Sequence, residues 1–445
     1  MKKTDRSSAW KRIILPLFAL VIAASAALPV GAVEPPEVSR CKAAYLYNFE
    51  NGTVLFEYNQ YETVFPAASV KLMTGLVAYS HLKDRMDEKV TVTASMLNEV
   101  KGNNISLDIG EVVTVRDMMY ALMTNCANDA AYVLAYTACG TAEAFVREMN
   151  EKAAQLGAFD THYTNPTGMH DEKMVTTAYD TALIAKAIYK NSELSEMVRV
   201  KNYVMDATNI RQYRNLYNKN ALIYTQPDSE KSYRYAAAIG MNAGYTSQGG
   251  YCITALAEDG GLTYLCIVMG AEEAEGEIYS YKNAQDLLDW AFASYKYVSV
   301  ISTERAIAEL PVKLSSAVDH VALIPVDSLT LYLPVDTDID SEIQIAVNTF
   351  DDYLNAPIRA GEECGSVTVT YDGRISSVKL VTTTDVARSD FLYFMNKVKE
   401  FSHSTFFIVM IVTAVVLTAG YIFYNATKDD VRRRKRAVKS LPKRR

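Results

Sequence analysis

The chain has 445 residues, of which 49% are hydrophobic and 22% charged, so it can form two or more domains with complete cores and is not extensively disordered. Its formal net charge is −7, but residues 33–427 alone contain 30 basic and 49 acidic residues, a balance of about −19. This acidic character argues against nucleic acid or anionic lipid as a partner of that segment.

The first predicted element is a secretory signal sequence in residues 1–32. Five basic residues precede an apolar run at 13–28, and the small residues Val30, Gly31 and Ala32 follow it. The mature chain is therefore expected to begin near Val33. A retained N-terminal anchor is the alternative, and it is disfavoured because the apolar run is short for a membrane span.

The next 250 residues or so alternate short β-like runs with helical stretches. The runs 43–49 and 53–58 flank Glu50-Asn51-Gly52, which predicts a hairpin whose Asn-Gly pair supplies positive φ angles. Residues 114–138 have apolar side chains at helical spacing, and a second hairpin is predicted around Asp259-Gly260-Gly261. This part is expected to form an α/β (α+β) domain with antiparallel strand pairing at 33–297.

Residues 298–388 have a different pattern, with short alternating strands separated by turn residues. The segments 321–334, 341–350, 365–373 and 375–384 carry the alternation. A small all-β domain is predicted here.

The C-terminal segments predict attachment to a membrane. In residues 389–405 apolar side chains recur at helical spacing, which predicts an amphipathic helix along the bilayer surface: Phe391, Phe394, Met395, Val398 and Phe401. Residues 406–424 contain no charge and are long enough to span the hydrocarbon core. The basic tail 425–445 indicates a cytoplasmic C-terminus and an extracytoplasmic ectodomain. A nucleic-acid or nuclear-localisation role for the tail is the disfavoured alternative.

The cysteines and histidines predict no metal site. The six cysteines lack CxxC spacing, and the five histidines form no HExxH or similar pair. Export permits disulfides, but the sequence fixes no pairing. No metal and no cofactor is expected, and the histidines are interpreted as surface or loop residues.

The segment FPAASVKLMTG, residues 65–75, resembles a serine-nucleophile segment without its serine. Enzymes that pair a serine nucleophile with a lysine base need the two residues three apart on a helix, where they share a face. Here Ala68 stands three residues before Lys71. Ser69 is two residues away and would point to nearly the opposite face, so it is predicted to pack rather than react.

This segment resembles the nucleophile segment of the D-alanyl-D-alanine carboxypeptidases, the low-molecular-weight penicillin-binding proteins, whose usual form is Pro-Ala-Ser-x-x-Lys. YALMTNCANDAAYVLA is similar to their second segment, Ser-x-Asn-Asp-Ala, with Asn128 in place and Cys126 at the serine position. IGMNAGYTSQGGYCI is similar to the third, Lys-Thr-Gly before Tyr-Thr, with Asn242 and Ala243 replacing lysine and threonine, and Gly244 and Thr246 retained.

The resemblance extends over roughly residues 41–390. Residues 145–171 and 176–187 are similar to the segment that follows the second motif, although Met174 stands where a histidine is common. LNAPIRAGEECGSVTVTYDG is similar to the family's C-terminal domain. The resemblance as a whole implies a transpeptidase-like domain with an antiparallel sheet and a helical lobe, which is followed by the β domain.

The resemblance also implies residue roles. In the family the serine attacks the carbonyl between two D-alanines and the first-motif lysine, here Lys71, is its base. The second-motif serine and asparagine relay the proton and hold the peptide, while the third-motif lysine and threonine bind the terminal carboxylate. Without a nucleophile at Ala68 the covalent route is lost. Without the third-motif lysine a charge-assisted contact of about 1.5–3 kcal/mol is lost as well.

Three interpretations follow. The favoured one is a membrane-tethered, catalytically impaired cell-wall protein that binds peptidoglycan stem peptides or a cell-wall protein. A structural role is the alternative for Lys71 and Asn128, which would then hydrogen-bond each other and keep the cleft in shape. The second is a residual or altered hydrolase that uses Ser69, or Cys126 with its thiol pKa lowered by Lys71. The third is a structural module with a vestigial cleft.

Overall fold

The structure, a computed structural model, describes residues 34–225 and 231–439. The predicted signal sequence and residues 440–445 of the basic tail lie outside the described residues. The chain divides into two compact units. The first runs to Lys296 and includes Tyr332–Asp336, and the second comprises Tyr297–Leu331 and the chain from Thr337 onward.

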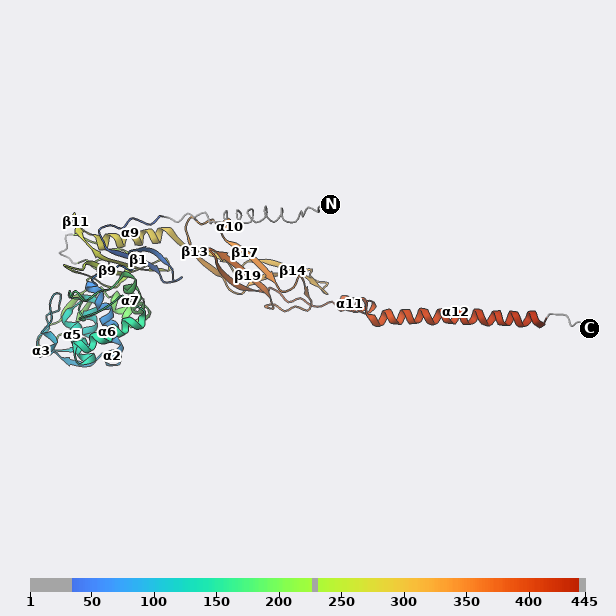
Figure 1. Cartoon of the computed structure of the whole chain (residues 1–445), viewed down its shortest axis with the longest axis horizontal. Helices are drawn as coiled ribbons and strands as arrows, with labels where there is room; N and C mark the ends of the chain where they lie inside the picture. Colours follow the sequence, from blue (N-terminus) through green and yellow to red (C-terminus); the bar gives the residue numbers. More distant parts are fainter. Residues whose placement is uncertain (1–33, 226–230, 440–445) are drawn as a thin grey trace, which may run out of the picture. The chain divides into compact units, whose positions relative to one another are not determined.

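The first unit contains an antiparallel sheet between a helical lobe and helix α9 (Tyr279–Ser294) (Figure 1). The sheet order is β2-β1-β10-β9-β7, and β8 also pairs with β9. Its strands are β1 (Ala43–Asn48), β2 (Val54–Tyr58), β7 (Ala238–Gly240), β8 (Ala243–Thr246), β9 (Gly250–Asp259) and β10 (Leu262–Ala271). Helix α9 packs against β9 and β10 on one face of the sheet, and α7 packs against β1 and β10 on the other (Figure 1).

The helical lobe surrounds α2 (Val70–Leu82), in which ten of 13 residues are buried. A helix that is apolar on all sides belongs in a core, and this one brings Lys71 with it. The other helices of the lobe are η1 (Ala67–Ser69), η2 (Lys83–Arg85), α3 (Ala94–Leu97), α4 (Val115–Asn125), α5 (Asn128–Cys139), α6 (Ala142–Leu156), α7 (Ala178–Lys190) and α8 (Ser192–Arg199). Short two-stranded sheets complete the unit: β3 (Lys89–Thr91) with β4 (Val112–Thr114), β5 (Asn202–Met205) with β6 (Arg214–Tyr217), and β11 (Glu273–Ala274) with β12 (Glu277–Ile278).

Both predicted hairpins are confirmed, with one correction. β9 and β10 pair from Asp259 and Leu262 outward, as the Asp-Gly-Gly turn predicts. In the β1–β2 turn Gly52 alone has a positive φ, 71°, among the described turn residues. Asn51 instead accepts a hydrogen bond from the Thr53 N–H (3.0 Å), so its side chain shapes a longer loop than the tight turn predicted.

The helical spacing at 114–138 corresponds to two helices, α4 and α5, which are separated at Cys126. That residue has a φ of 57°, and its N–H caps α4 by donating to the carbonyl of Leu122. Asn103 Nδ2 donates to the Cys126 carbonyl (3.1 Å). These contacts stabilise a left-handed conformation that a non-glycine residue rarely adopts, and α5 begins two residues later.

The second unit is β-rich, as predicted. Its larger sheet has the order β17-β19-β20-β15-β14-β18, and β13 pairs with β16. Its strands are β14 (Ala308–Lys313), β15 (His320–Pro325), β17 (Gln344–Thr349), β18 (Leu354–Asn355), β19 (Glu363–Tyr371) and β20 (Arg374–Thr382), with one short helix, α10 (Ile339–Glu342). β13 (Tyr295–Ile301) and β16 (Leu329–Pro334) each have residues in both units. The four segments predicted as strands supply β15 to β17, β19 and β20.

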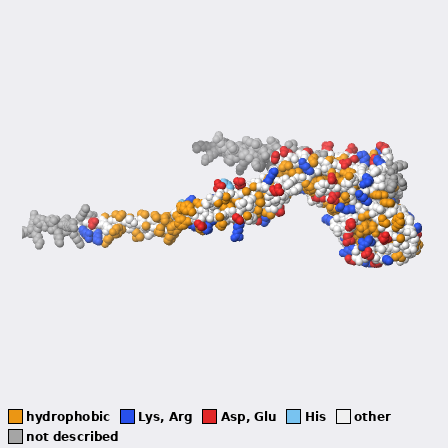
Figure 2. Space-filling view, turned by 180° about the vertical axis from the view of Figure 1, so that it is seen from behind, with side chains coloured by type: hydrophobic (Ala, Val, Ile, Leu, Met, Phe, Trp, Pro, Cys, Tyr) orange, Lys and Arg blue, Asp and Glu red, His pale blue; other side chains and the backbone are white. Residues whose placement is uncertain are grey.

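Two helices end the described chain. α11 (Asp390–Ser402) covers the predicted amphipathic segment and has no buried residue. α12 (Thr405–Lys439) is the one helix of the described residues that is long and apolar enough to cross a membrane, over Thr405–Asp429. Hydrophobic side chains predominate along it in Figure 2.

Candidate active site

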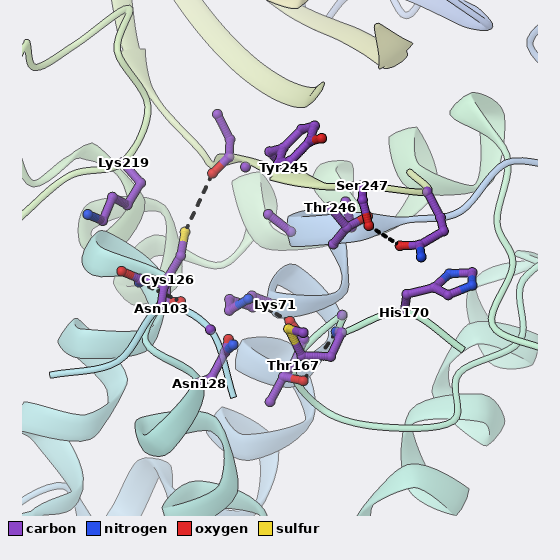
Figure 3. Close-up of a pocket in the computed structure, with 18 residues that line it drawn as sticks. Lys71, Asn103, Cys126, Asn128, Thr167, His170, Lys219, Tyr245, Thr246 and Ser247 are labelled. Carbon is purple, nitrogen blue, oxygen red and sulfur yellow. Dashed lines mark hydrogen bonds between the residues drawn. The ribbon is translucent and has the colours of Figure 1, made fainter. Parts of the chain in front are cut away.

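A pocket of about 560 Å³ opens in the first unit where the helical lobe meets the edge of β8 (Figure 3). Its walls come from the start of α2, the α4–α5 junction, the loops at 102–103 and 167–170, and the chain from β8 to Gln248. Seven of the nine predicted site residues line it: Ala68, Lys71, Cys126, Asn128, Ala243, Gly244 and Thr246. Ser69 and Asn242 do not.

The position predicted for a nucleophile holds a methyl group. Ala68 lies in the 3₁₀ turn that leads into α2, lines the pocket and is 8% exposed. The Ser69 hydroxyl instead donates to the carbonyl of Pro66 (2.8 Å) and does not line the pocket. A Cβ on Gly244 would come within 2.6 Å of the Ala68 Cβ, so only glycine lets the strand approach this closely.

Lys71 is buried on the pocket floor and points into the site. Its Nζ donates to the carbonyl of Thr167 (2.5 Å). Burial lowers the pKa of Lys71, while the nearby Cys126 thiol acts in the opposite direction. The result is an amine that gives up its proton more readily than an exposed lysine, which suits a base.

Asn128 is buried on the same side of the pocket, and it makes no hydrogen bond to Lys71. Its Nδ2 donates to the carbonyl of Lys101 (2.5 Å), and its Oδ1 has no partner among the described residues. Because a carbonyl can only accept, this bond fixes the amide orientation and leaves Oδ1 as a free acceptor. The predicted Lys71–Asn128 hydrogen bond is therefore wrong, since two loop carbonyls take its place.

Cys126 is not an activated thiol in this structure. Its Sγ lies 3.9 Å from the carbonyl oxygen of Ala243. Burial raises the pKa of the Cys126 thiol, and this outweighs the opposing influence of Lys71 and Lys219. The expectation that Lys71 would leave this thiol with a lowered pKa is therefore wrong.

This geometry predicts slow alkylation of Cys126. In the native chain at pH 7, iodoacetamide is expected to modify Cys126 at least about tenfold more slowly than the half-buried Cys139, because Cys126 is only 5% exposed. Mass mapping of modified peptides measures this, and unfolding in guanidinium should remove the difference. Faster native modification of Cys126 than of Cys139 would contradict the assignment.

The third segment no longer presents a cation. Asn242 is 3% exposed, and its Nδ2 donates to the carbonyl of Ala68 (2.7 Å), which ties this segment to the start of α2. Ala243 contributes only a methyl group and its backbone. Thr246 remains at the pocket, where its Oγ1 accepts a hydrogen bond from the Gly249 N–H (3.0 Å).

The structure also brings residues to the pocket that sequence reasoning missed. Lys219, Asn103 and Ser247 line it, and so does His170, which the sequence predicts only as a surface or loop residue. His170 packs edge-on against Phe65 and belongs to the loop whose carbonyl accepts from Lys71. No spacing pattern in the sequence marks these positions, because the loops that carry them meet only in the folded chain.

Comparisons with known proteins match both units of the chain to D-alanyl-D-alanine carboxypeptidases. A family model described as "D-alanyl-D-alanine carboxypeptidase" matches residues 30–273, and one described as "Penicillin-binding protein 5, C-terminal domain" matches residues 295–388. The D-alanyl-D-alanine carboxypeptidase DacF of Bacillus subtilis (strain 168) is 29% identical over 365 residues, which cover 80% of this chain and 88% of DacF. DacA of Haemophilus influenzae is 27% identical over 374 residues, which cover 80% and 88% of the two chains.

Solved structures agree. Penicillin binding protein 5 from Haemophilus influenzae has a TM-score of 0.55 at 25% identity, covering 80% of this chain and all of that one. The D-alanyl-D-alanine carboxypeptidase from Mycobacterium tuberculosis H37Rv has a TM-score of 0.53 at 26% identity, covering 60% of this chain and 96% of that one.

Proposed function

The chain belongs to the D-alanyl-D-alanine carboxypeptidase family and is a cell-wall protein of that family, and from this premise we propose that its cleft binds peptidoglycan stem peptides without hydrolysing them. The observation that carries the proposal is the Ala68 methyl group in the pocket, three residues before a buried Lys71, with the Ser69 hydroxyl bound to Pro66. A site with a base and no nucleophile can recognise a peptide but cannot form the acyl-enzyme.

The cleft retains features useful for binding. Asn128 offers an acceptor that has no partner among the described residues, and Thr246 offers a hydroxyl. The pocket is large enough for a short peptide. A hydrolase based on Ser69 is not favoured because its hydroxyl lies outside the pocket. One based on Cys126 is not favoured because burial raises the pKa of its thiol. A vestigial cleft in a purely structural module is the remaining alternative.

The proposal has a direct test. The purified full-length chain in detergent is expected to bind a stem pentapeptide saturably, as measured by calorimetric titration. It should release D-alanine on the order of 10⁶-fold more slowly than an active relative such as DacF, because removal of a nucleophile alone has effects of that size. D-alanine release at the relative's rate would overturn the impairment, and the absence of saturable binding would favour the vestigial cleft.

We also propose how the chain is arranged at the membrane. α12 would be the single span, with the basic residues after Asp429 on the cytoplasmic side. The carboxypeptidase-like domain and the β domain would then lie outside the cell membrane. α11 exposes Phe391, Phe394 and Phe401 by 48–71%, which suits a helix at the outer lipid surface. The domain boundaries proposed from the sequence, 33–297 and 298–388, fit this arrangement.

A further inference from the structure

The edge strand β17 has one side without a strand partner. It ends the larger sheet of the second unit beside β19 (Figure 1), and no described strand pairs with its other side. The Phe350 N–H donates to the carbonyl of Cys364 (2.9 Å), in register with the β17–β19 pairs. Since the backbone groups of successive residues point to opposite sides of a strand, those of Ile345, Val347 and Thr349 point away from β19. Three residues therefore present N–H and C=O groups to a further strand.

One face of β17 is apolar and only partly covered. Ile345 and Val347 lie opposite Val369 and Val367 of β19, and residues paired in this way share a face of the sheet. The two β19 valines are 2% and 0% exposed, whereas Ile345 is 47% and Val347 39% exposed. The apolar layer of this domain thus continues to its edge and is open there. An added strand with apolar side chains at alternate positions would cover it.

β17 also lacks the features that usually protect an exposed edge. Its six residues, QIAVNT, include no charge and no proline, and its pairing with β19 runs without a register shift. Among the other strands that end the two large sheets, β7 and β18 have only three and two residues, while β2 contains Glu57 and pairs irregularly with β1. Charges, short length and irregular pairing are what natural proteins use to prevent unwanted pairing at an edge. β17 is therefore an edge open to strand addition.

Acidic residues stand at both ends of β17 and determine which kind of strand fits beside it. Asp340 and Glu342 precede it, Asp351 and Asp352 follow it, and residues 335–358 contain no lysine, arginine or histidine. None of the four carboxylates forms a salt bridge with a described residue of the second unit. A second copy of the chain, paired in either direction, would bring these carboxylates together at both ends of β17. A strand with basic ends would meet opposite charges instead.

We propose that β17 is a docking edge for an extended segment of another protein, which adds to the sheet as a further strand. The segment carries apolar side chains at alternate positions, which cover Ile345 and Val347, and lysine or arginine at both ends, which face the flanking carboxylates. Backbone hydrogen bonds to the outward groups of β17 hold the segment, and the charges select it. This surface is separate from the pocket of the first unit and does not depend on the function proposed for that pocket.

The probe is the nine-residue peptide acetyl-KKVTVTVKK-amide, which has basic ends and alternating valines. The full-length chain in detergent is expected to bind it saturably in calorimetric titration, and to bind acetyl-EEVTVTVEE-amide at least about tenfold more weakly. A basic peptide N-methylated at its five central residues keeps every charge but cannot donate backbone hydrogen bonds from its centre, so its binding should fall by a similar factor. If the wild-type chain does not bind the basic peptide, or binds the methylated one equally well, the proposal is wrong.

A substitution in β17 tests the same contact from the protein side. Val347→Pro removes an outward N–H and leaves the hydrogen bonds to β19, because proline is tolerated at such edge positions. It should weaken binding of the basic peptide at least about tenfold, whereas Val347→Ile, the control that keeps the N–H, should stay within about threefold of wild type. Undiminished binding by a folded Val347→Pro chain would contradict strand addition. A wild-type dimer in sedimentation that Val347→Pro dissociates would identify a second copy as the occupant and also overturn the proposal.

The charges are tested by a paired substitution. Asp351→Asn combined with Asp352→Asn is expected to weaken binding of the basic peptide about fivefold, the size of effect that two exposed charge pairs produce. The control combines Glu304→Gln with Asp327→Asn, two exposed acids that lie between β13 and β14 and between β15 and β16, and it should leave binding unchanged. If the first pair weakens binding no more than the control pair, the requirement for basic ends is wrong.

Discussion

The Ala68→Ser variant is expected to form a covalent adduct with benzylpenicillin, whereas the wild-type chain is expected to form none. Ala68 already lines the pocket three residues before Lys71, so a serine hydroxyl at this position would share the lysine's side of the helix start. Burial lowers the pKa of Lys71, which makes its neutral amine available to accept the serine proton. Intact-mass measurement of the protein after incubation with the antibiotic reports the adduct directly.

Two variants separate this expectation from nonspecific acylation. Lys71→Met in the Ala68→Ser background should abolish the adduct, and Ser69→Ala in the same background should leave it, since Ser69 is bound to Pro66 outside the pocket. Labelling is expected to be slower than in a family member with an intact third motif, because Asn242 and Ala243 remain. An adduct of equal yield on the wild-type chain, or none on a folded Ala68→Ser chain, would contradict the interpretation of this site.

Much of the fold was predictable because its signals are local. Alternating strands around Asp-Gly-Gly specify the β9–β10 hairpin within about twenty residues, and the uncharged run before the basic tail specifies α12. The break at Cys126 was not predictable in this way. Apolar periodicity continues through it, and cysteine does not by itself end a helix. The interruption is stabilised by Asn103, which is more than twenty residues away.

The candidate site likewise contains some features that the sequence predicts and others that it does not. The structure places four motif residues in one pocket, as the motifs predict: Ala68, Lys71, Cys126 and Asn128. This was predictable because each motif lies on an element whose position the family resemblance implies. The partners of these residues were not predictable. Lys71 and Asn128 donate hydrogen bonds to loop carbonyls. Every residue has a backbone carbonyl, so the order of side chains in the sequence does not show which carbonyl will accept. Lys219 is a single lysine between two asparagines, with no periodicity to distinguish it from a surface residue.

The Arg214→Met variant is expected to lower the free energy of unfolding by about 3–5 kcal/mol, because it leaves a buried carboxylate without its counter-ion. Arg214 donates from Nη1 and Nη2 to the two oxygens of Glu111 (2.7 and 2.9 Å), whose side chain is 0% exposed. Thr208 Oγ1 (2.8 Å) and the Asp108 N–H (3.0 Å) also donate to that carboxylate. These bonds join the β5–β6 hairpin to the chain before β4, which continues back to the pocket loop at 102–103.

Thermal unfolding of the full-length chain measures the effect, with an expected fall in Tm of roughly 10 °C. Although burial raises the pKa of Glu111, its hydrogen bonds with Arg214 and the Asp108 backbone hold it below the ordinary value of 4.5. The contribution of the Glu111 carboxylate to the free energy of unfolding is therefore present above pH 4.5 and is lost as pH falls through the lowered pKa. In Glu111→Gln the free energy of unfolding should depend less on pH in this acidic range. Arg116→Met is the control, since the Arg116–Asp87 pair (3.0 Å) is 45% and 87% exposed and contributes at most about 1 kcal/mol. Equal losses in the two arginine variants would show that the buried pair stabilises the fold no more than an exposed pair does.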